Sequence, residues 1–243
     1  MKNTVHSITS EPLTFEEIEA ILSKDMKLEL SPGSVALIER SKAYLDRKIE
    51  EAGGPLYGIT TGFGALCNIR ISKSDLSKLQ ENLVISHACN VGPEIPHDVV
   101  RLMLLLKAHA LAKGNSAVQR KTVEMIIGLF NHHIVPVVCE QGSLGASGDL
   151  APLAMLFLPL LGRGEVWYQG RRRHAGEVLA ELGWEPLKLE AKEGLALLNG
   201  TQFMSALAVY TLLKSFRLVK LADIIGAISL DAFDGLIEPF LEN

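Results

Sequence analysis

Residues 142–153 read Gly-Ser-Leu-Gly-Ala-Ser-Gly-Asp-Leu-Ala-Pro-Leu, and they are the most informative stretch of this 243-residue chain. The stretch places Ser147 between Ala146 and Gly148 in a run with few bulky side chains. If the amide nitrogen of Gly148 attacks the carbonyl carbon of Ala146, a five-membered ring closes with loss of water, and Ser147 loses a second water. Gly148 offers an unhindered nitrogen and unusual backbone angles, which this closure needs. The predicted product is a methylidene-imidazolone (MIO), an electrophile that no ordinary side chain supplies.

A second interpretation of the same stretch is the start of a helix. Ser147 or Asp149 would then be the N-cap, with Pro152 in the first turn and an apolar run behind it. The tripeptide Ala-Ser-Gly alone favours this interpretation, because short motifs match by chance. The full twelve residues favour the electrophile.

These twelve residues resemble the signature of the histidine and aromatic amino acid ammonia-lyases. Three further segments are similar to segments of that family: YGITTGFG at 57–64, LQENLVISHA at 79–88, and EGLALLNGTQ at 193–202. The four segments occur in order, and the resemblance covers nearly the whole chain. It implies a mainly α fold of the ammonia-lyase type, with a small β-hairpin and a central helical bundle that is only begun.

The resemblance implies an MIO-dependent carbon-nitrogen lyase whose substrate attacks the methylidene carbon, and it implies roles for several residues of this chain. Tyr57 matches the tyrosine that transfers a proton, a contribution of about 10²–10⁴-fold in rate. His87 matches the position that selects the substrate, and a histidine there is similar to the enzymes for histidine or tyrosine. Asn199 matches a residue that hydrogen-bonds the imidazolone or the substrate, and Gln202 lies near the same site. Asn90 departs from the family, which usually has glycine there.

The implied reaction is elimination of ammonia from L-histidine to give trans-urocanate. Three alternatives stay open: a tyrosine or phenylalanine ammonia-lyase, an aminomutase that returns ammonia to the β-carbon, and a catalytically silent, truncated lyase subunit. For Asp149, which adjoins the cyclising glycine, we expect either assistance to dehydration or capping of the following helix.

Helical periodicity predicts helices that begin at Thr14 and Ser31 and others over 74–88, 97–113 and 117–131. Residues 165–168 and 171–174, joined by Gln-Gly, predict the hairpin. A long apolar pattern over 201–231 predicts a buried helix, broken near glycine 226. We therefore predict an MIO-bearing N-terminal domain over 1–200, and over 201–243 the truncated start of the central bundle.

Family members are about twice as long and build each active site from several subunits of a tetramer. The resemblance therefore implies a homo-oligomer that acts on a small amino acid. It also allows a separate C-terminal half as a partner of this chain.

Composition restricts the class of protein further. With 48% hydrophobic and 21% charged residues, the chain has the balance of a soluble globular protein. A net charge of −4 argues against nucleic-acid binding. The three cysteines (Cys67, Cys89 and Cys139) form no Cys-x-x-Cys pair, which argues against a disulfide framework or a zinc site.

Motifs of other classes do not fit. The glycines match neither nucleotide-binding fingerprint, and Ser147 lacks the Gly-x-Ser-x-Gly context of a serine hydrolase. The N-terminus has no signal-peptide pattern, and the apolar run 150–161 is too short to span a bilayer. We expect no metal, nucleotide or membrane partner, and a cytoplasmic protein.

Overall fold

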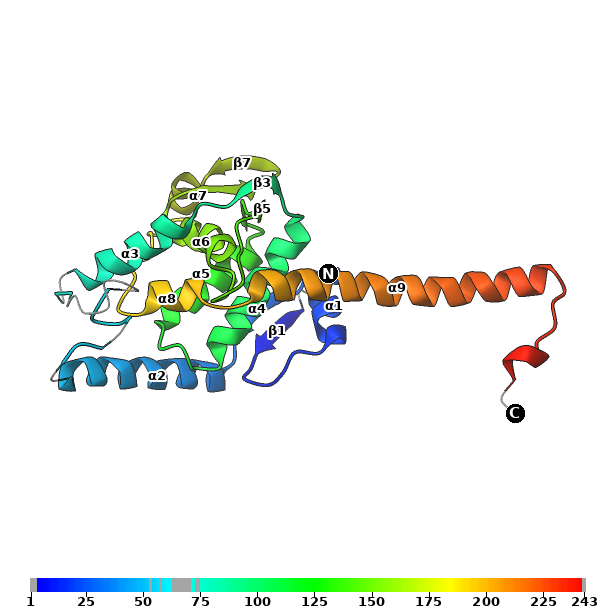
Figure 1. Ribbon diagram of the computed structural model, residues 1–243, viewed down its shortest axis with the longest axis horizontal. Helices are drawn as coiled ribbons and strands as arrows, with labels where there is room; N and C mark the ends of the chain where they lie inside the picture. The colour runs from blue at the N-terminus through cyan, green and yellow to red at the C-terminus, as the bar shows by residue number, and fades with distance from the viewer. Residues whose placement is uncertain (1–3, 53, 57, 63–70, 73–74, 242–243) are drawn as a thin grey trace.

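The computed structural model describes residues 4–52, 54–56, 58–62, 71–72 and 75–241. The fold is mainly helical, as the sequence predicts: most helices and small sheets form one packed body, from which one long helix projects (Figure 1). The helices are α1 (Phe15–Ser23), α2 (Pro32–Glu51), α3 (Leu76–His87), α4 (His97–Ala112), α5 (Arg120–Asn131), α6 (Leu150–Phe157), α7 (Ala175–Glu181), α8 (Glu193–Leu198) and α9 (Gln202–Ala232). The 3₁₀ turns among the described residues are η2 (Leu158–Leu161) and η3 (Glu238–Phe240).

Local sequence signals set where the first two long helices begin. Thr14 caps α1 in a capping box: its hydroxyl accepts from the Glu17 amide at 3.2 Å, and the Glu17 carboxylate accepts from the Thr14 amide at 2.8 Å. The Ser31 hydroxyl caps α2 by accepting from the amide of Ser34 at 3.1 Å, with Pro32 in the first turn. Both predicted helix starts are confirmed.

Three small sheets accompany the helices in the residues that the structure describes. The strands are β1 (Val5–Ile8), β2 (Lys27–Leu30), β3 (Val91–Glu94), β4 (Val135–Pro136), β5 (Cys139–Gln141), β6 (Glu165–Tyr168) and β7 (Arg171–His174). The predicted hairpin is the antiparallel pair β6–β7, and β4 adds a third strand along β6. The parallel pair β1–β2 and the antiparallel pair β3–β5 were not predicted, because strands of three or four residues carry little alternation.

The core is centred on α4. The side chains of Leu102, Met103, Leu104 and Leu105 are fully buried, and the helix packs against both α5 and α9. The turn between α4 and α5 is longer than predicted, because Ala117 has a positive φ of 55° and α5 begins only at Arg120. Gly114 in this turn lies so close to α2 that an added Cβ would be 2.6 Å from the backbone of Leu37.

The last helix differs from the prediction in two respects. It runs unbroken over 31 residues, because a lone glycine such as Gly226 costs a helix only about 1 kcal/mol. It is also not buried: Phe203 and Ala206 are the buried residues of α9, and most of its length lies away from the body (Figure 1). The segment Glu193–Ala232, with a mean hydropathy of 1.2 in its most apolar window, is long and apolar enough to cross a membrane by length and composition alone. The apolar pattern over 201–231 predicts a buried helix and gives no indication of a membrane span, so this candidate was not predicted.

Candidate active site

The loop that carries the predicted electrophile joins β5 to α6 and folds back on itself. Three of its glycines have positive φ: 144° at Gly142, 76° at Gly145 and 102° at Gly148. Isolated bridges link Gly148 with Gly145 and with Ala146. The backbone of residue 146 is therefore brought against that of residue 148, which is the approach that ring closure requires. Glycine makes this turn possible because other residues rarely adopt these backbone angles.

Gly148 packs directly against a second glycine from a distant part of the chain. A Cβ added to Gly148 would be 2.5 Å from the carbonyl oxygen of Gly200 and 2.9 Å from its amide nitrogen. Ala146 and Ser147 are exposed, whereas Gly148 is half-buried. The loop thus presents its serine to the outside while its glycine is held against the turn between α8 and α9.

Asp149 is fully buried and joins three segments. One carboxylate oxygen accepts from the Ser143 hydroxyl at 2.8 Å, and the other accepts from the Met204 amide at 3.0 Å. Its own amide donates to the carbonyl of Gly200 at 2.8 Å. Asp149 does occupy the N-cap position of α6, but its side chain makes no capping bond there. The expectation that it caps the following helix is therefore wrong: the carboxylate caps the first turn of α9 instead.

His87 is the last residue of α3 and is half-buried. Its Nδ1 lies 2.8 Å from the carbonyl oxygen of Leu83, an acceptor that requires a proton on Nδ1 in the neutral ring. In that tautomer Nε2 is an acceptor. The following strand β3 pairs with β5, so that Val91 lies opposite Gln141. The sheet β3–β5 therefore brings the end of α3 beside the start of the electrophile loop.

Asn90 fits into the position where the family usually has glycine. Its side-chain amide donates to the Cys139 carbonyl at 2.8 Å, and its Cβ is 2.7 Å from the place where a Cβ on Gly142 would lie. The departure from the family is thus accommodated because residue 142 is a glycine.

Asn199 and Gln202 flank Gly200 at the turn between α8 and α9. Asn199 is exposed and ends α8, and its carbonyl oxygen accepts from Nζ of Lys107 at 2.9 Å. The Oε1 atom of Gln202 is buried without a hydrogen-bond partner, and a Cβ on Gly200 would collide with it. The unpaired Gln202 oxygen therefore lies beside Gly200, the glycine that packs on Gly148.

Tyr57 lies outside the described residues. Its neighbours form a turn: the Ile59 and Thr60 amides both donate to the Leu56 carbonyl, at 3.1 and 2.9 Å. Residues 58–62, which the structure describes, form no helix. The role of Tyr57 stays a prediction.

Two residues that support the site were not singled out from the sequence. Gln80 is fully buried, and its Oε1 accepts from the amides of Gly194 and Leu195, at 2.9 and 3.4 Å, at the start of α8. Lys107 is 2% exposed, and desolvation lowers its pKa to about 7. The signal for Lys107 was a lysine inside the apolar periodicity of α4.

The part of the chain that the structure describes contains no candidate metal site. It has no group of three or more histidine, cysteine, aspartate or glutamate side chains that could hold an ion. The features that fit an MIO are the apposed backbones of residues 146 and 148, a Gly148 with no space for a side chain, and the unpaired Gln202 acceptor beside Gly200.

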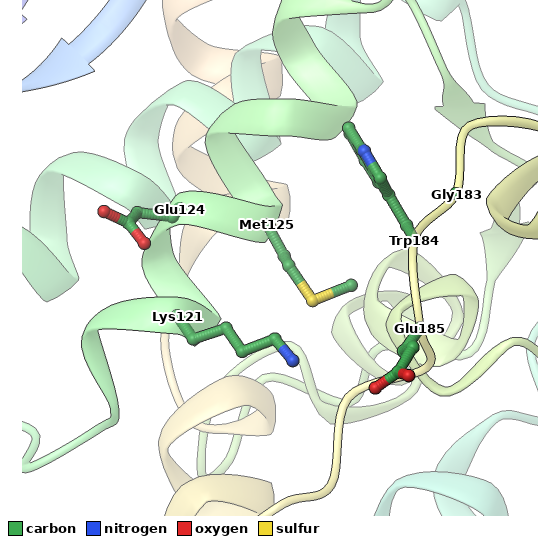
Figure 2. Close-up of a pocket in the computed structure, with 6 residues that line it drawn as sticks. All are labelled: Lys121, Glu124, Met125, Gly183, Trp184 and Glu185. Atoms are coloured by element: carbon green, nitrogen blue, oxygen red, sulfur yellow. The ribbon is translucent and has the colours of Figure 1, made fainter.

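A separate surface pocket of about 360 Å³ is formed by α5 and the segment after α7 (Figure 2). Trp184 and Met125 form its apolar wall, and Lys121, Glu124 and Glu185 are its charged side chains (Figure 2). None of the predicted site residues lines it. We assign the candidate active site to the electrophile loop and not to this pocket.

The profile of the aromatic amino acid lyase family matches residues 13–243. The chain belongs to this family. Among curated lyases, it is 44% identical to a histidine ammonia-lyase of Myxococcus xanthus over 234 residues, which are 96% of this chain and 46% of that protein. It is also 44% identical to a histidine ammonia-lyase of Caldanaerobacter subterraneus, over 99% of this chain and 47% of that protein. This lyase chain corresponds to the N-terminal part of these relatives and spans about half their length.

Solved structures of lyase-family enzymes share the fold. A histidine ammonia-lyase of Trypanosoma cruzi superposes with a TM-score of 0.87 at 36% identity, over 97% of this chain and 46% of that one. A tyrosine aminomutase of Streptomyces globisporus superposes with a TM-score of 0.89 at 36% identity, over 97% of this chain and 44% of that one. The helical ammonia-lyase fold predicted from the sequence is confirmed.

Proposed function

We propose that this chain is the N-terminal part of an ammonia-lyase that converts L-histidine to trans-urocanate and ammonia, with an MIO built from Ala146, Ser147 and Gly148. The observation that carries the proposal is the folded loop, in which the backbones of residues 146 and 148 are apposed. The group would supply an electrophilic methylidene carbon to the substrate's amino group. The histidine substrate is supported by relatives that are 44% identical over nearly the whole chain.

Formation of the group needs only residues of this chain. The Gly148 nitrogen bonds to the Ala146 carbonyl carbon, and the carbonyl oxygen leaves as water. The Ser147 hydroxyl and the hydrogen on its Cα then leave as a second water. Each modified chain should therefore lack the mass of two waters. Loop folding that presses residue 146 on residue 148 lowers the entropy cost of the first step.

The chain's own residues would then bind and orient the substrate. With Nδ1 of His87 bound to Leu83, Nε2 is the atom able to accept a hydrogen bond from the polar ring of a substrate. The unpaired Gln202 oxygen can accept a hydrogen bond from an ammonium or amide group beside Gly200. We propose that Tyr57 transfers a proton, because the segment 57–64 is similar to the family segment that carries the proton-transferring tyrosine.

Two experiments test this proposal. Intact-mass measurement of the purified chain should show a deficit of two waters, and the Ser147→Ala variant should show none. An unmodified, folded wild-type chain would contradict the proposed electrophile. An ultraviolet assay on histidine, tyrosine and phenylalanine then tests the substrate, with the chain mixed with the C-terminal part of the Myxococcus xanthus relative. Turnover of tyrosine alone would contradict histidine.

Aminomutase activity is the second candidate, because a tyrosine aminomutase shares the fold at 36% identity. Product analysis separates it from the lyase: a β-amino acid in place of urocanate would establish the mutase. A catalytically silent subunit is a third candidate, since the chain spans about half of its relatives. Turnover by the chain without any added partner would exclude it.

We infer further that the chain forms a homo-oligomer, and that its partner surface is α9. Exposed apolar side chains follow this helix along its length, among them Leu218, Ile224, Ile225 and Ile228. A large exposed apolar surface is typical of an interface. Lys214, Arg217 and Lys220 recur every third residue in the middle of α9, so a membrane span that included this exposed part of the helix would bury three cations at high cost. We therefore propose that the exposed part of α9 belongs to a helical bundle of a cytoplasmic protein.

A further inference from the structure

Lys107 is a buried lysine that the proposed chemistry does not use. It lies on α4 among apolar side chains, with 2% of its surface exposed. Burial of an ammonium costs free energy unless a partner compensates for the lost water. No carboxylate pairs with Lys107 in the part of the chain that the structure describes. A reason for keeping a lysine here must therefore lie in the contacts that it does make.

Those contacts lead to the turn between α8 and α9. Nζ donates to the carbonyl oxygen of Asn199 at 2.9 Å and lies 5.8 Å from the centre of the Phe157 ring. Asn199 is the residue at which α8 ends, and Gly200 and Thr201 lead into α9. The lysine therefore fixes the start of this turn from inside the core.

The opposite side of the same turn meets the electrophile loop. The Gly200 carbonyl accepts from the Asp149 amide at 2.8 Å, and Gly148 packs on Gly200 with no space for a side chain. The turn is thus held between Lys107 on one side and residues 148–149 on the other. A shift of the Asn199 carbonyl would move the surface against which Gly148 is pressed.

We propose that Lys107 is a positioning residue for ring closure: its buried amino group fixes the turn 199–201, and the turn holds Gly148 against the Ala146 carbonyl. This inference rests on the proposed function, because it concerns formation of the same electrophile. It assigns the lysine no contact with the substrate.

The first test follows the rate of two-water loss by intact mass after synthesis of the chain in a cell-free system. Lys107→Met removes the donor and keeps much of the side-chain volume, Lys107→Arg keeps a donor, and Lys113→Met is a matched control at an exposed lysine that ends the same helix. We expect Lys107→Met to slow water loss by about tenfold or more, because small displacements of reacting groups cost about that much or more in rate. The arginine and Lys113→Met variants should stay within about threefold of wild type. Wild-type kinetics in a folded Lys107→Met chain would overturn the proposal.

The second test needs no electrophile, so it separates this inference from the proposed function. In a Ser147→Ala background, amide hydrogen exchange is compared for peptides that cover the turn 199–204 and for peptides from α4 and α5. A positioning role predicts that Lys107→Met accelerates exchange at the turn by about tenfold while the core helices keep their protection. Equal acceleration everywhere would show a merely structural lysine and overturn the proposal.

The remaining outcomes are also decisive. If the wild-type chain never loses two waters, the proposed function fails, and the exchange experiment still decides whether Lys107 holds the turn. If Lys107→Met does not fold, Lys107→Leu, which also has no donor, replaces it with the same expectation. If neither variant folds while Lys107→Arg does, the lysine is required by the core as a whole and the positioning role is wrong.

Discussion

The carboxylate of Asp149 connects the electrophile loop to the long helix. Its two oxygens accept from Ser143 and from Met204, and the second partner is 55 residues away in the sequence. Hydrogen bonds to a buried charged group contribute more than neutral ones, about 1.5–3 kcal/mol each. Asp149 therefore stabilises both the shape of the loop and the position of α9 beside it.

The Asp149→Asn variant should lower the free energy of unfolding by about 1–3 kcal/mol, because its amide group would face one of the two donors. Urea denaturation measures the change. Asp231→Asn, an exposed aspartate near the other end of α9, is the control and should change stability by less than about 0.5 kcal/mol. Equal stability of both variants would show that the Asp149 bonds contribute nothing.

Lys107 should give the protein a pH-dependent stability. Burial lowers its folded pKa to about 7, while the unfolded lysine keeps a value near 10.5. Between these values the unfolded state binds more protons, so this group's contribution to stability is lost as the pH falls from 10.5 toward 7. From pH 7 to pH 9 the free energy of unfolding should therefore rise about 2 kcal/mol more in wild type than in Lys107→Met. Urea denaturation at the two pH values measures it, and parallel changes in both proteins would exclude a shifted pKa.

At the scale of the element, α9 is a helix that packs on the rest of the chain only over its first turns. Its first turns pack on α4, where Phe203 and Ala206 are buried, and the rest projects from the body (Figure 1). Isolated helices gain most of their stability from packing of an apolar face, so α9 needs a covering partner. We expect that partner to be other copies of this chain.

The Ile225→Asp variant, at a side chain that is 61% exposed, should weaken self-association of the chain by about tenfold or more, because a charge would enter an apolar interface. Size-exclusion chromatography with light scattering measures the mass of the species in solution. Lys220→Asp, also exposed on α9, is the control for a change of charge at a position that already carries a charge. An unchanged oligomer in Ile225→Asp would place the interface elsewhere.

At the scale of the whole molecule, we propose that the chain contains one part of a lyase site. That part would comprise the loop, the His87 segment and the turn with Asn199, because the chain spans about half the length of its relatives. Mixing with the C-terminal part of the Myxococcus xanthus relative should raise histidine turnover by about 100-fold or more, since positioned acid–base groups contribute about 10²–10⁴-fold. The matched control is the same mixture with the Ser147→Ala chain. No gain over the chain alone would contradict a divided site.

Much of the local structure could be predicted from the sequence. The capping box at Thr14, the proline start of α2 and the Gln-Gly turn of the hairpin are short-range signals, and all three are confirmed. The late start of α5 was not predicted, because the positive φ of Ala117 is imposed by packing and not by its residue type. The domain boundary at 200 and the role of Tyr57 stay predictions.

The sequence by itself determined the glycine-rich loop and the identity of its serine, because backbone freedom and a leaving hydroxyl are properties of single residues. It also determined the helical class, through periodicity. Only the tertiary structure decided that Asp149 caps α9 and not α6, that Lys107 holds the turn at Asn199, and that α9 is exposed. Those contacts join residues far apart in the chain, and burial in the folded molecule fixes their partners, so no local pattern specifies them.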